Sequence, residues 1–312
     1  MKRYPIKLEP ITKTALWGGR RLKEQYQIKS SLDTVSEAWV LSLRPGDENI
    51  ITNGEAKGLS LSAYLKGLGD MGADDHFPLL VKMIDAQDKL SVQVHPDDAY
   101  AHANGVDSGK TEMWVVLDAE PGASLILGLK EGVSASDFEN AVKDRDLGAV
   151  MREVKVKAGD VFYIPAGLLH AIGAGILIAE IQQNSDTTYR VWDYERRGAD
   201  GKLRELHIDH AIAVTRPIPD DEIARAQFSL PSSLPGDALA STPFFSVSQT
   251  RGNVTFSVPD DSFLSVLVTS GSGSLAAAGE SVTLSPADSV LLPRGLGSVE
   301  ITGDVTCLIS KP

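Results

Sequence analysis

Four side chains in the first 170 residues could together hold a divalent metal ion: Gln93, His95, Glu112 and His170. Two imidazoles, one carboxylate and one amide oxygen form a mixed set of nitrogen and oxygen donors. Such a set suits a borderline cation such as Zn²⁺ and leaves positions for water or substrate. Each residue alone is weak evidence, because a lone histidine at a strand end is usually structural. The metal hypothesis therefore depends on the elements that position the four side chains.

The segment 91–98, SVQVHPDD, alternates small apolar and polar residues up to its proline. Alternation with a period of two predicts a half-buried β-strand. Ser91, Gln93 and His95 would share one face, and the two valines between them would face the core. Residues two apart on a strand are roughly 6.5–7 Å apart at the backbone, so Gln93 and His95 could converge on one ion.

Glu112 and His170 lie next to other predicted strands. Glu112 begins a strand at 112–117, with Lys110 two residues earlier on the same face. His170 follows the strand 161–165 and a Pro-Ala-Gly turn, which could carry the imidazole back over the mouth of a barrel. A strand at 188–194 would place Arg190, Trp192 and Tyr194 on one face, and a permanent cation there could stabilise an oxyanion.

Many short strands with glycine, serine and proline turns predict a mainly β fold. The segment 136–150 departs from this pattern, because its apolar residues recur with helical spacing and charges lie between them, which predicts an inserted amphipathic helix. Further strands are expected at 36–42, 77–85, 124–129 and 175–183, and a short helix at 209–214.

A faint internal repeat relates two parts of the chain. Residues 159–167, GDVFYIPAG, have the same spacing as residues 287–295, ADSVLLPRG, and Ser298 stands where the first copy has His170. The strand that begins at Glu112 likewise resembles one that begins at Ser262. The repeat predicts two related β-barrels, of which the second lacks the ligand types. Chance similarity of two Pro-Gly turns is the alternative.

Composition limits the classes of partner. Lys and Arg number 30 against 42 Asp and Glu, for a formal net charge of −12 over 312 residues. This charge argues against nucleic acid and anionic membranes, and an anionic substrate would need local cations. The single cysteine, Cys307, excludes an internal disulfide, and no run of about 18 apolar residues exists. We expect a soluble cytoplasmic protein, either a monomer or a weak homodimer.

The spacing Gly159, Pro165, Gly167 and His170 resembles the second signature of the cupin barrels. Gln93 and His95 with Glu112 resemble the first signature, although a glutamine replaces the first histidine and the gap to the acid is longer. Ala174 stands where cupins usually have asparagine. The resemblance implies two cupin-type β-barrels (jelly rolls): a catalytic domain at 1–235 with helical insertions, and a degenerate cupin-like β domain at 236–312.

A narrower resemblance is to class I mannose-6-phosphate isomerases, in their short bacterial form. It depends on the segments 90–98 (LSVQVHPDD), 109–112 (GKTE) and 182–194 (QQNSDTTYRVWDY). The segments 17–19 and 78–82 also fit, so the match covers most of residues 1–215.

This family implies a zinc-dependent aldose–ketose isomerase with one Zn²⁺ per chain, which interconverts mannose 6-phosphate and fructose 6-phosphate through a cis-enediol. Gln93, His95, Glu112 and His170 fall on its metal positions. Arg190 falls on its catalytic arginine, and Ser91 and Lys110 fall on positions associated with the substrate, where Lys110 could hold phosphate. Trp17 is a further candidate wall of the substrate site, with a place in the core as the alternative. A zinc-bound water, a glutamate or a histidine could be the general base.

Two other functions remain open from the sequence. An iron-dependent cupin oxygenase would use a similar ligand set, although Gln93 and the isomerase segments count against it. A non-catalytic sugar-binding cupin would need neither the metal nor Lys110 and Arg190. Two residues also have simpler interpretations: Arg190 could pair with Asp193, and Lys110 could be a solvated surface lysine.

Overall fold

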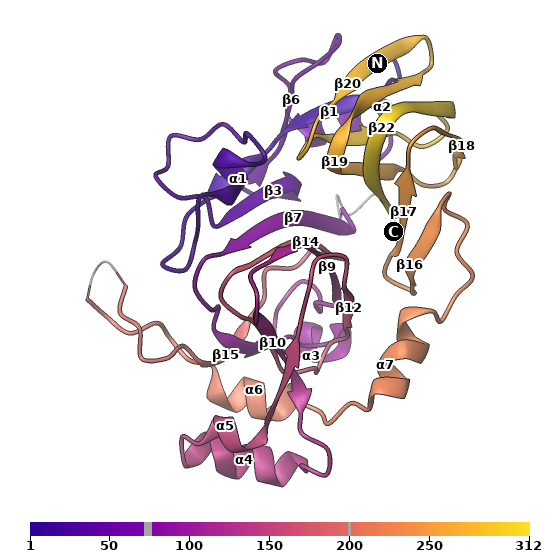
Figure 1. Ribbon diagram of the computed structural model, residues 1–312. Helices are drawn as coiled ribbons and strands as arrows, with labels where there is room; N and C mark the ends of the chain where they lie inside the picture. Colours follow the sequence, from indigo (N-terminus) through magenta and orange to yellow (C-terminus); the bar gives the residue numbers. More distant parts are fainter. Residues whose placement is uncertain (72–76, 199–200) are drawn as a thin grey trace. The chain divides into compact units, whose positions relative to one another are not determined.

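The computed structural model describes residues 1–71, 77–198 and 201–312. The chain divides into two compact units, each built from distant segments (Figure 1). Unit 1 contains Met1–Lys13, Arg20–Met83 and Gln227–Pro312, and unit 2 contains Thr14–Gly19 and Ile84–Ala226. The sequence predicts two consecutive domains, 1–235 and 236–312, whereas each unit here combines separate segments of the chain. Unit 1 does so because β1 (Ile6–Glu9), near the N-terminus, pairs with β21 (Ser289–Leu292), near the C-terminus.

Unit 1 is built around two long antiparallel strands, β19 (Leu264–Ala277) and β22 (Gly297–Lys311). Its remaining strands are β2 (Ile11–Lys13), β3 (Glu37–Leu41), β4 (Leu43–Arg44), β5 (Asp47–Glu48), β6 (Ile50–Ile51), β16 (Asp237–Ser241), β17 (Ser246–Arg251), β18 (Val254–Val258) and β20 (Glu280–Leu284), and its helices are α1 (Arg21–Glu24) and α2 (Leu61–Leu68). The apolar faces of β19 and β22 bury a cluster of valine, leucine and isoleucine that includes Cys307. Burial raises the pKa of the Cys307 thiol to about 12.

The chain passes from unit 1 into unit 2 within β7 (Leu79–Ala86). The strands of unit 2 are β8 (Val92–Val94), β9 (Glu112–Ala119), β10 (Ser124–Leu129), β11 (Met151–Lys155), β12 (Val161–Ile164), β13 (His170–Ile172), β14 (Ile176–Gln183) and β15 (Tyr189–Trp192). One sheet has the strand order β11-β10-β13-β8-β15, and β9 pairs with both β12 and β14. The mainly β fold expected from the sequence is confirmed.

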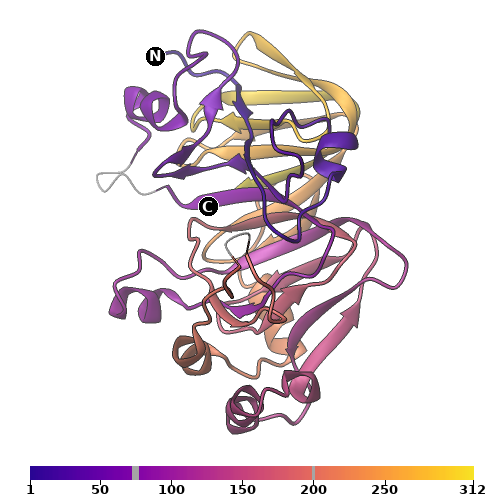
Figure 2. The same ribbon diagram turned by 90° about the vertical axis from the view of Figure 1, so that its left-hand side faces the viewer.

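The helices of unit 2 are α3 (Asp98–Ala103), α4 (Ala135–Lys143), α5 (Leu147–Val150), α6 (Ile208–Val214) and α7 (Asp220–Gln227), of which α7 ends at the boundary with unit 1. Helices α4, α5 and α6 lie together at one end of the unit (Figure 2). The expectation of one continuous helix over 136–150 is wrong. The Ser134 capping box begins α4, but Arg145 has a φ of +58°, a left-handed conformation that ends the first helix before α5 begins.

The internal repeat is present as repeated backbone hydrogen bonding. In unit 2 the Gly159 N–H donates to the Val116 carbonyl (2.8 Å), and in unit 1 the Ala287 N–H donates to the Val268 carbonyl (2.9 Å). In both copies a four-residue strand comes next, then a Pro-x-Gly turn whose glycine has positive φ. The two copies therefore share one local structure, which makes chance similarity of two turns a poor explanation.

Among the helices of residues 1–71, 77–198 and 201–312, none combines the length and the hydrophobicity that a membrane-spanning helix needs.

Candidate metal centre and active site

Three of the predicted ligands converge in the interior of unit 2. His95 Nε2 lies 3.5 Å from Glu112 Oε2, and His170 Nε2 lies 3.5 Å from Glu112 Oε1. The three ligand atoms lie within 4.8 Å of one another, and all three side chains are buried. Within the described residues they form the one such group of His, Cys, Asp and Glu side chains.

Strand pairing produces this convergence. His170 begins β13 and lies directly opposite Gln93 of β8, while the Gly167 N–H of the preceding turn donates to the His95 carbonyl (2.9 Å). Val92 and Val94 are fully buried in the core, as the alternating pattern predicted. Their burial fixes which face of β8 turns toward the other ligands, because a shift by one residue would reverse both faces.

Each histidine is oriented by a backbone carbonyl. His95 Nδ1 lies 2.8 Å from the Thr187 carbonyl oxygen, and His170 Nδ1 lies 2.8 Å from that of Leu168. A carbonyl only accepts, so each Nδ1 must hold the hydrogen, and each Nε2 carries the lone pair. Burial also lowers the pKa of His170 to about 4, so its imidazole is neutral near neutral pH.

Glu112 contributes the carboxyl group of the centre. Burial, and next the neighbouring carboxylate of Glu180, raise the pKa of Glu112, while Lys110 opposes this shift. Its Oε1 has no hydrogen-bond donor in the described part of the chain, although His170 Nε2 is 3.5 Å away. An imidazole nitrogen and a carboxyl oxygen that face each other in a buried place can both bind a cation between them, so this donor set fits a metal ion.

Gln93 adjoins the same group. Its Nε2 lies 3.4 Å from His170 Nε2, and its Oε1 accepts from the Ser91 hydroxyl (3.3 Å). A half turn about the last side-chain torsion would exchange the two amide ends and direct the oxygen toward the histidine. Gln93 is thus placed to add a neutral oxygen ligand to the two imidazoles and the carboxylate.

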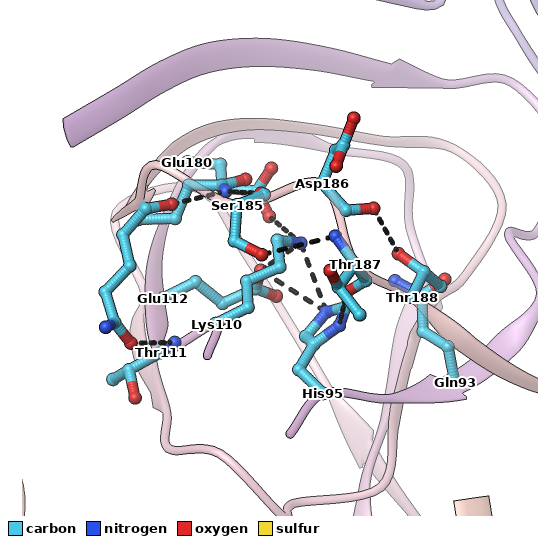
Figure 3. Close-up of polar contacts among 12 residues, drawn as sticks. Gln93, His95, Lys110, Thr111, Glu112, Glu180, Ser185, Asp186, Thr187 and Thr188 are labelled. Carbon is cyan, nitrogen blue, oxygen red and sulfur yellow. Dashed lines mark hydrogen bonds and ion pairs between the residues drawn. The ribbon is translucent and has the colours of Figure 1, made fainter. Parts of the chain in front are cut away.

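Lys110 is part of this centre rather than a surface residue, since it is only 4% exposed. Its ammonium lies 2.6 Å from Glu112 Oε2, 3.1 Å from His95 Nε2 and 3.9 Å from Glu180 Oε1. Figure 3 shows this lysine among these three side chains. The interpretation of Lys110 as a solvated lysine is therefore wrong.

Glu180 was missed from the sequence. It lies on β14, is buried, and accepts from the Trp114 indole N–H (3.1 Å). The signal was present in the sequence, because Glu180 is the one charged residue in the strand ILIAEIQQ. A charge that follows four apolar residues of a strand needs a partner when it is buried, and Lys110 is such a partner.

Arg190 of β15 lies beside Ser91. The Arg190 Nε donates to the Ser91 hydroxyl (3.3 Å), and Nη1 donates to the Glu205 carbonyl (2.8 Å). Asp193 pairs with Arg196 and Arg204, so the alternative in which it holds Arg190 gains no support. Hydrogen bonds therefore connect Arg190 to Gln93 through one serine hydroxyl.

The structure differs from the sequence-based expectations for Tyr194, expected on the same strand face as Arg190, and for Trp17, expected as a candidate wall of the substrate site. Strand β15 ends at Trp192, and Tyr194 has a φ of +57°, so Tyr194 does not continue the face of Arg190 as expected. Trp17 is 5% exposed and packs in a hydrophobic cluster with Ile84 and Trp114. Its surroundings favour a packing role over a substrate wall.

The second copy of the repeat lacks every ligand. Strand register and the turn hydrogen bonds align Gln93, His95, Glu112 and His170 with Ser257, Pro259, Leu264 and Ser298, respectively. Ser298 stands where the sequence repeat placed it. The strand alignment differs by two residues from the sequence comparison, because Leu264, not Ser262, is the counterpart of Glu112. One centre per chain is therefore expected.

Comparisons with known proteins agree with this architecture. The family model "Mannose-6-phosphate isomerase, cupin domain" matches residues 237–312, and "Phosphomannose isomerase type I, catalytic domain" matches residues 6–117. The fold and the buried His-Glu-His group thus define a cupin protein with a candidate metal centre.

Relatives that match over their full length identify the family within the cupin proteins. The chain is 37% identical to a mannose-6-phosphate isomerase of Streptococcus mutans (98% of each chain) and 36% identical to mannose-6-phosphate isomerase ManA of Bacillus subtilis (99% of each chain). The crystal structure of the mannose 6-phosphate isomerase from Bacillus subtilis superposes with a TM-score of 0.88 at 32% identity, covering 98% of this chain and 99% of the other. The chain belongs to the mannose-6-phosphate isomerase family and is an enzyme of that family.

Proposed function

We propose that this enzyme interconverts mannose 6-phosphate and fructose 6-phosphate through a cis-enediol, with one Zn²⁺ per chain. Gln93, His95, Glu112 and His170 would hold the ion. The observation that supports this proposal most directly is the buried convergence of His95 Nε2, His170 Nε2 and the Glu112 carboxylate within 4.8 Å. Two nitrogen ligands, a carboxylate and an amide oxygen suit zinc and leave room in its coordination for a substrate oxygen.

When bound, the zinc ion supplies a Lewis acid that polarises the substrate oxygens. The reaction itself moves one proton from C2 to C1 of the open-chain aldose and a second proton from the C2 oxygen to the C1 oxygen, and negative charge develops on these two oxygens. Arg190 would stabilise that charge as a permanent cation. Its hydrogen bond to Ser91 holds the guanidinium on the same side as Gln93.

Ser91 and Lys110 would contact the substrate. The positive charge of Lys110 is already matched by Glu112 and Glu180. We therefore assign it a hydroxyl or carbonyl oxygen of the sugar near the metal rather than the dianionic phosphate. Arg196 and Arg204 share the single carboxylate of Asp193, so this pair of arginines would offer phosphate the local cations that the net charge of −12 makes necessary.

One purified sample tests the proposal. Metal content is measured by mass spectrometry, and isomerisation is measured by coupling fructose 6-phosphate formation to a dye-linked reporter. We expect zinc together with turnover of mannose 6-phosphate. Iron with oxygen uptake would favour an oxygenase, and metal without turnover would favour a sugar-binding cupin.

The proposal extends to the setting of the enzyme: a monomer or weak homodimer in the cytoplasm, with neither nucleic acid nor membrane as partner. The single buried cysteine and the net charge of −12 support it. Light scattering across a hundredfold range of protein concentration tests the oligomeric part. A tight dimer at all concentrations would contradict it.

A further inference from the structure

The lone pair of His95 Nε2 already has a partner from the chain. His95 Nδ1 faces the Thr187 carbonyl at 2.8 Å and so holds the ring hydrogen. Lys110 Nζ lies 3.1 Å from Nε2. An ammonium group has only hydrogens to offer, so the contact is a donation from Lys110 into the Nε2 lone pair.

A neutral imidazole has one lone pair on its unprotonated nitrogen. That lone pair can accept a hydrogen bond or form a metal bond, but not both. The Lys110–His95 hydrogen bond and coordination of a metal by His95 therefore exclude each other. The exclusion is a consequence of valence and does not depend on small differences in distance.

The carboxylate of Glu112 also contacts Lys110 and is also a candidate metal ligand. Lys110 Nζ lies 2.6 Å from Glu112 Oε2, which itself lies 3.5 Å from His95 Nε2. The lysine thus contacts two of the atoms that would bind the ion. Glu180 Oε1, 3.9 Å from Nζ, gives the ammonium another carboxylate. A lysine that leaves His95 therefore keeps a counter-ion in this buried place.

We propose that Lys110 competes with the catalytic metal for His95, so that metal binding exchanges one cation for another and turns Lys110 toward the substrate. This inference rests on the metal site of the proposed function. The exchange keeps a cation beside Glu112 before and after metal binding, which avoids an isolated buried carboxylate. It also releases one N–H of Lys110 for a sugar oxygen, so that metal loading and substrate recognition are coupled through one side chain.

The test is the zinc affinity of Lys110→Met, in which a side chain of similar length lacks the charge and the donors. Wild type and variant are stripped of metal with a chelator and titrated with zinc against a fluorescent zinc indicator. A hydrogen bond to a charged group and the repulsion between two cations are both removed, so zinc should bind about tenfold more tightly or better. Lys143→Met, at an exposed position of α4, is the matched control for the loss of one charge, and it should bind zinc like wild type.

The outcomes separate the two proposals. If zinc binds wild type, and its affinity for Lys110→Met is equal or lower, the proposed exchange is wrong and the metal site itself stands. Wild type that binds no zinc overturns both.

A second measurement does not depend on the folding of the variant. In a crystal structure of the zinc-loaded wild-type enzyme, His95 should coordinate the ion and Lys110 Nζ should lie beyond hydrogen-bond distance of His95 Nε2. Zinc held without His95, with the Lys110–His95 hydrogen bond preserved, would overturn the exchange.

Discussion

The side chain of Arg190 is connected to the metal site by hydrogen bonds through Ser91 to Gln93, and it is not itself a candidate ligand, which allows its role to be separated from metal binding. We predict that Arg190→Ala keeps its full zinc content and lowers kcat by about 100-fold or more, because it removes a cation from the developing oxyanion. Metal analysis and steady-state kinetics on the same preparation give both numbers. Arg225→Ala, on exposed α7, is the control and should retain normal turnover.

Normal turnover in Arg190→Ala would remove this residue from the catalytic machinery. Loss of zinc in the same variant would instead show that the arginine acts by holding Ser91 and Gln93 in place.

His170 makes the stability of the metal-free protein decrease at acidic pH. Burial lowers its folded-state pKa to about 4 from an ordinary 6.5, so the fold disfavours the protonated ring. Stability from this group is intact above pH 6.5 and is lost as the pH falls toward 4. Glu112, whose pKa is raised, works in the opposite sense, so the comparison must be made between wild type and His170→Gln.

We predict that, between pH 7 and 4, the stability of His170→Gln relative to wild type improves by on the order of 3 kcal/mol. Urea unfolding of both proteins in excess chelator, at pH 7, 5.5 and 4, measures this change. Parallel pH profiles would mean that His170 is readily protonated in the fold. Near neutral pH the variant should also have lost its zinc and its activity together.

At the scale of an element, the turn before β13 decides where His170 lies. Gly167 has a φ of +87°, and a Cβ there would lie 2.9 Å from Arg216 Nε and 3.0 Å from the Val214 carbonyl oxygen. Gly295 occupies the matching turn of the second copy with a φ of +66°, and its added Cβ would meet Asp260 at an ordinary 3.5 Å. The two turns therefore differ in crowding, and only the turn at Gly167 leads into a metal ligand.

We predict that Gly167→Ala weakens zinc binding by about tenfold or more and destabilises the protein by about 2 kcal/mol, from backbone strain and crowding. Gly295→Ala should cost about 1 kcal/mol and leave zinc binding unchanged. Calorimetric zinc titration and thermal unfolding of both variants provide the comparison. Equal zinc affinities would show that the centre tolerates movement of this turn.

For the whole molecule, the duplicated fold predicts a stoichiometry. The counterparts of the four ligands in the second copy are Ser257, Pro259, Leu264 and Ser298. None of them offers an imidazole or a carboxylate. We therefore predict one zinc per chain in the wild type and none in Glu112→Ala. A second tightly held equivalent that survives this substitution would point to a metal site elsewhere in the chain.

The sequence was most informative where one local pattern had one structural solution. Alternation in Ser91–His95 left only one face for the valines, and the buried Val92 and Val94 confirm it. The pattern was less informative at 136–150, since helical spacing of apolar residues continues through Arg145 although the backbone does not. A single left-handed residue changes the chain direction without changing the periodicity.

Residue types and their spacing were enough to establish the family, the mainly β fold, the four ligand candidates and the loss of those ligand types in the second copy. The tautomers of the two histidines needed the folded chain. The carbonyls of Leu168 and Thr187 that fix them belong to the backbone, which every sequence has, so residue type carries no signal for them.

The partners of Glu112 likewise needed the folded chain. Lys110 lies two residues before β9 and Glu180 lies on β14, so the 3.9 Å distance from Lys110 to Glu180 depends on how β9 and β14 pair. Spacing along a chain gives the face on which a residue lies. Whether two buried charges meet depends on the register between strands that are 68 residues apart, from Glu112 to Glu180, and only folding sets that register.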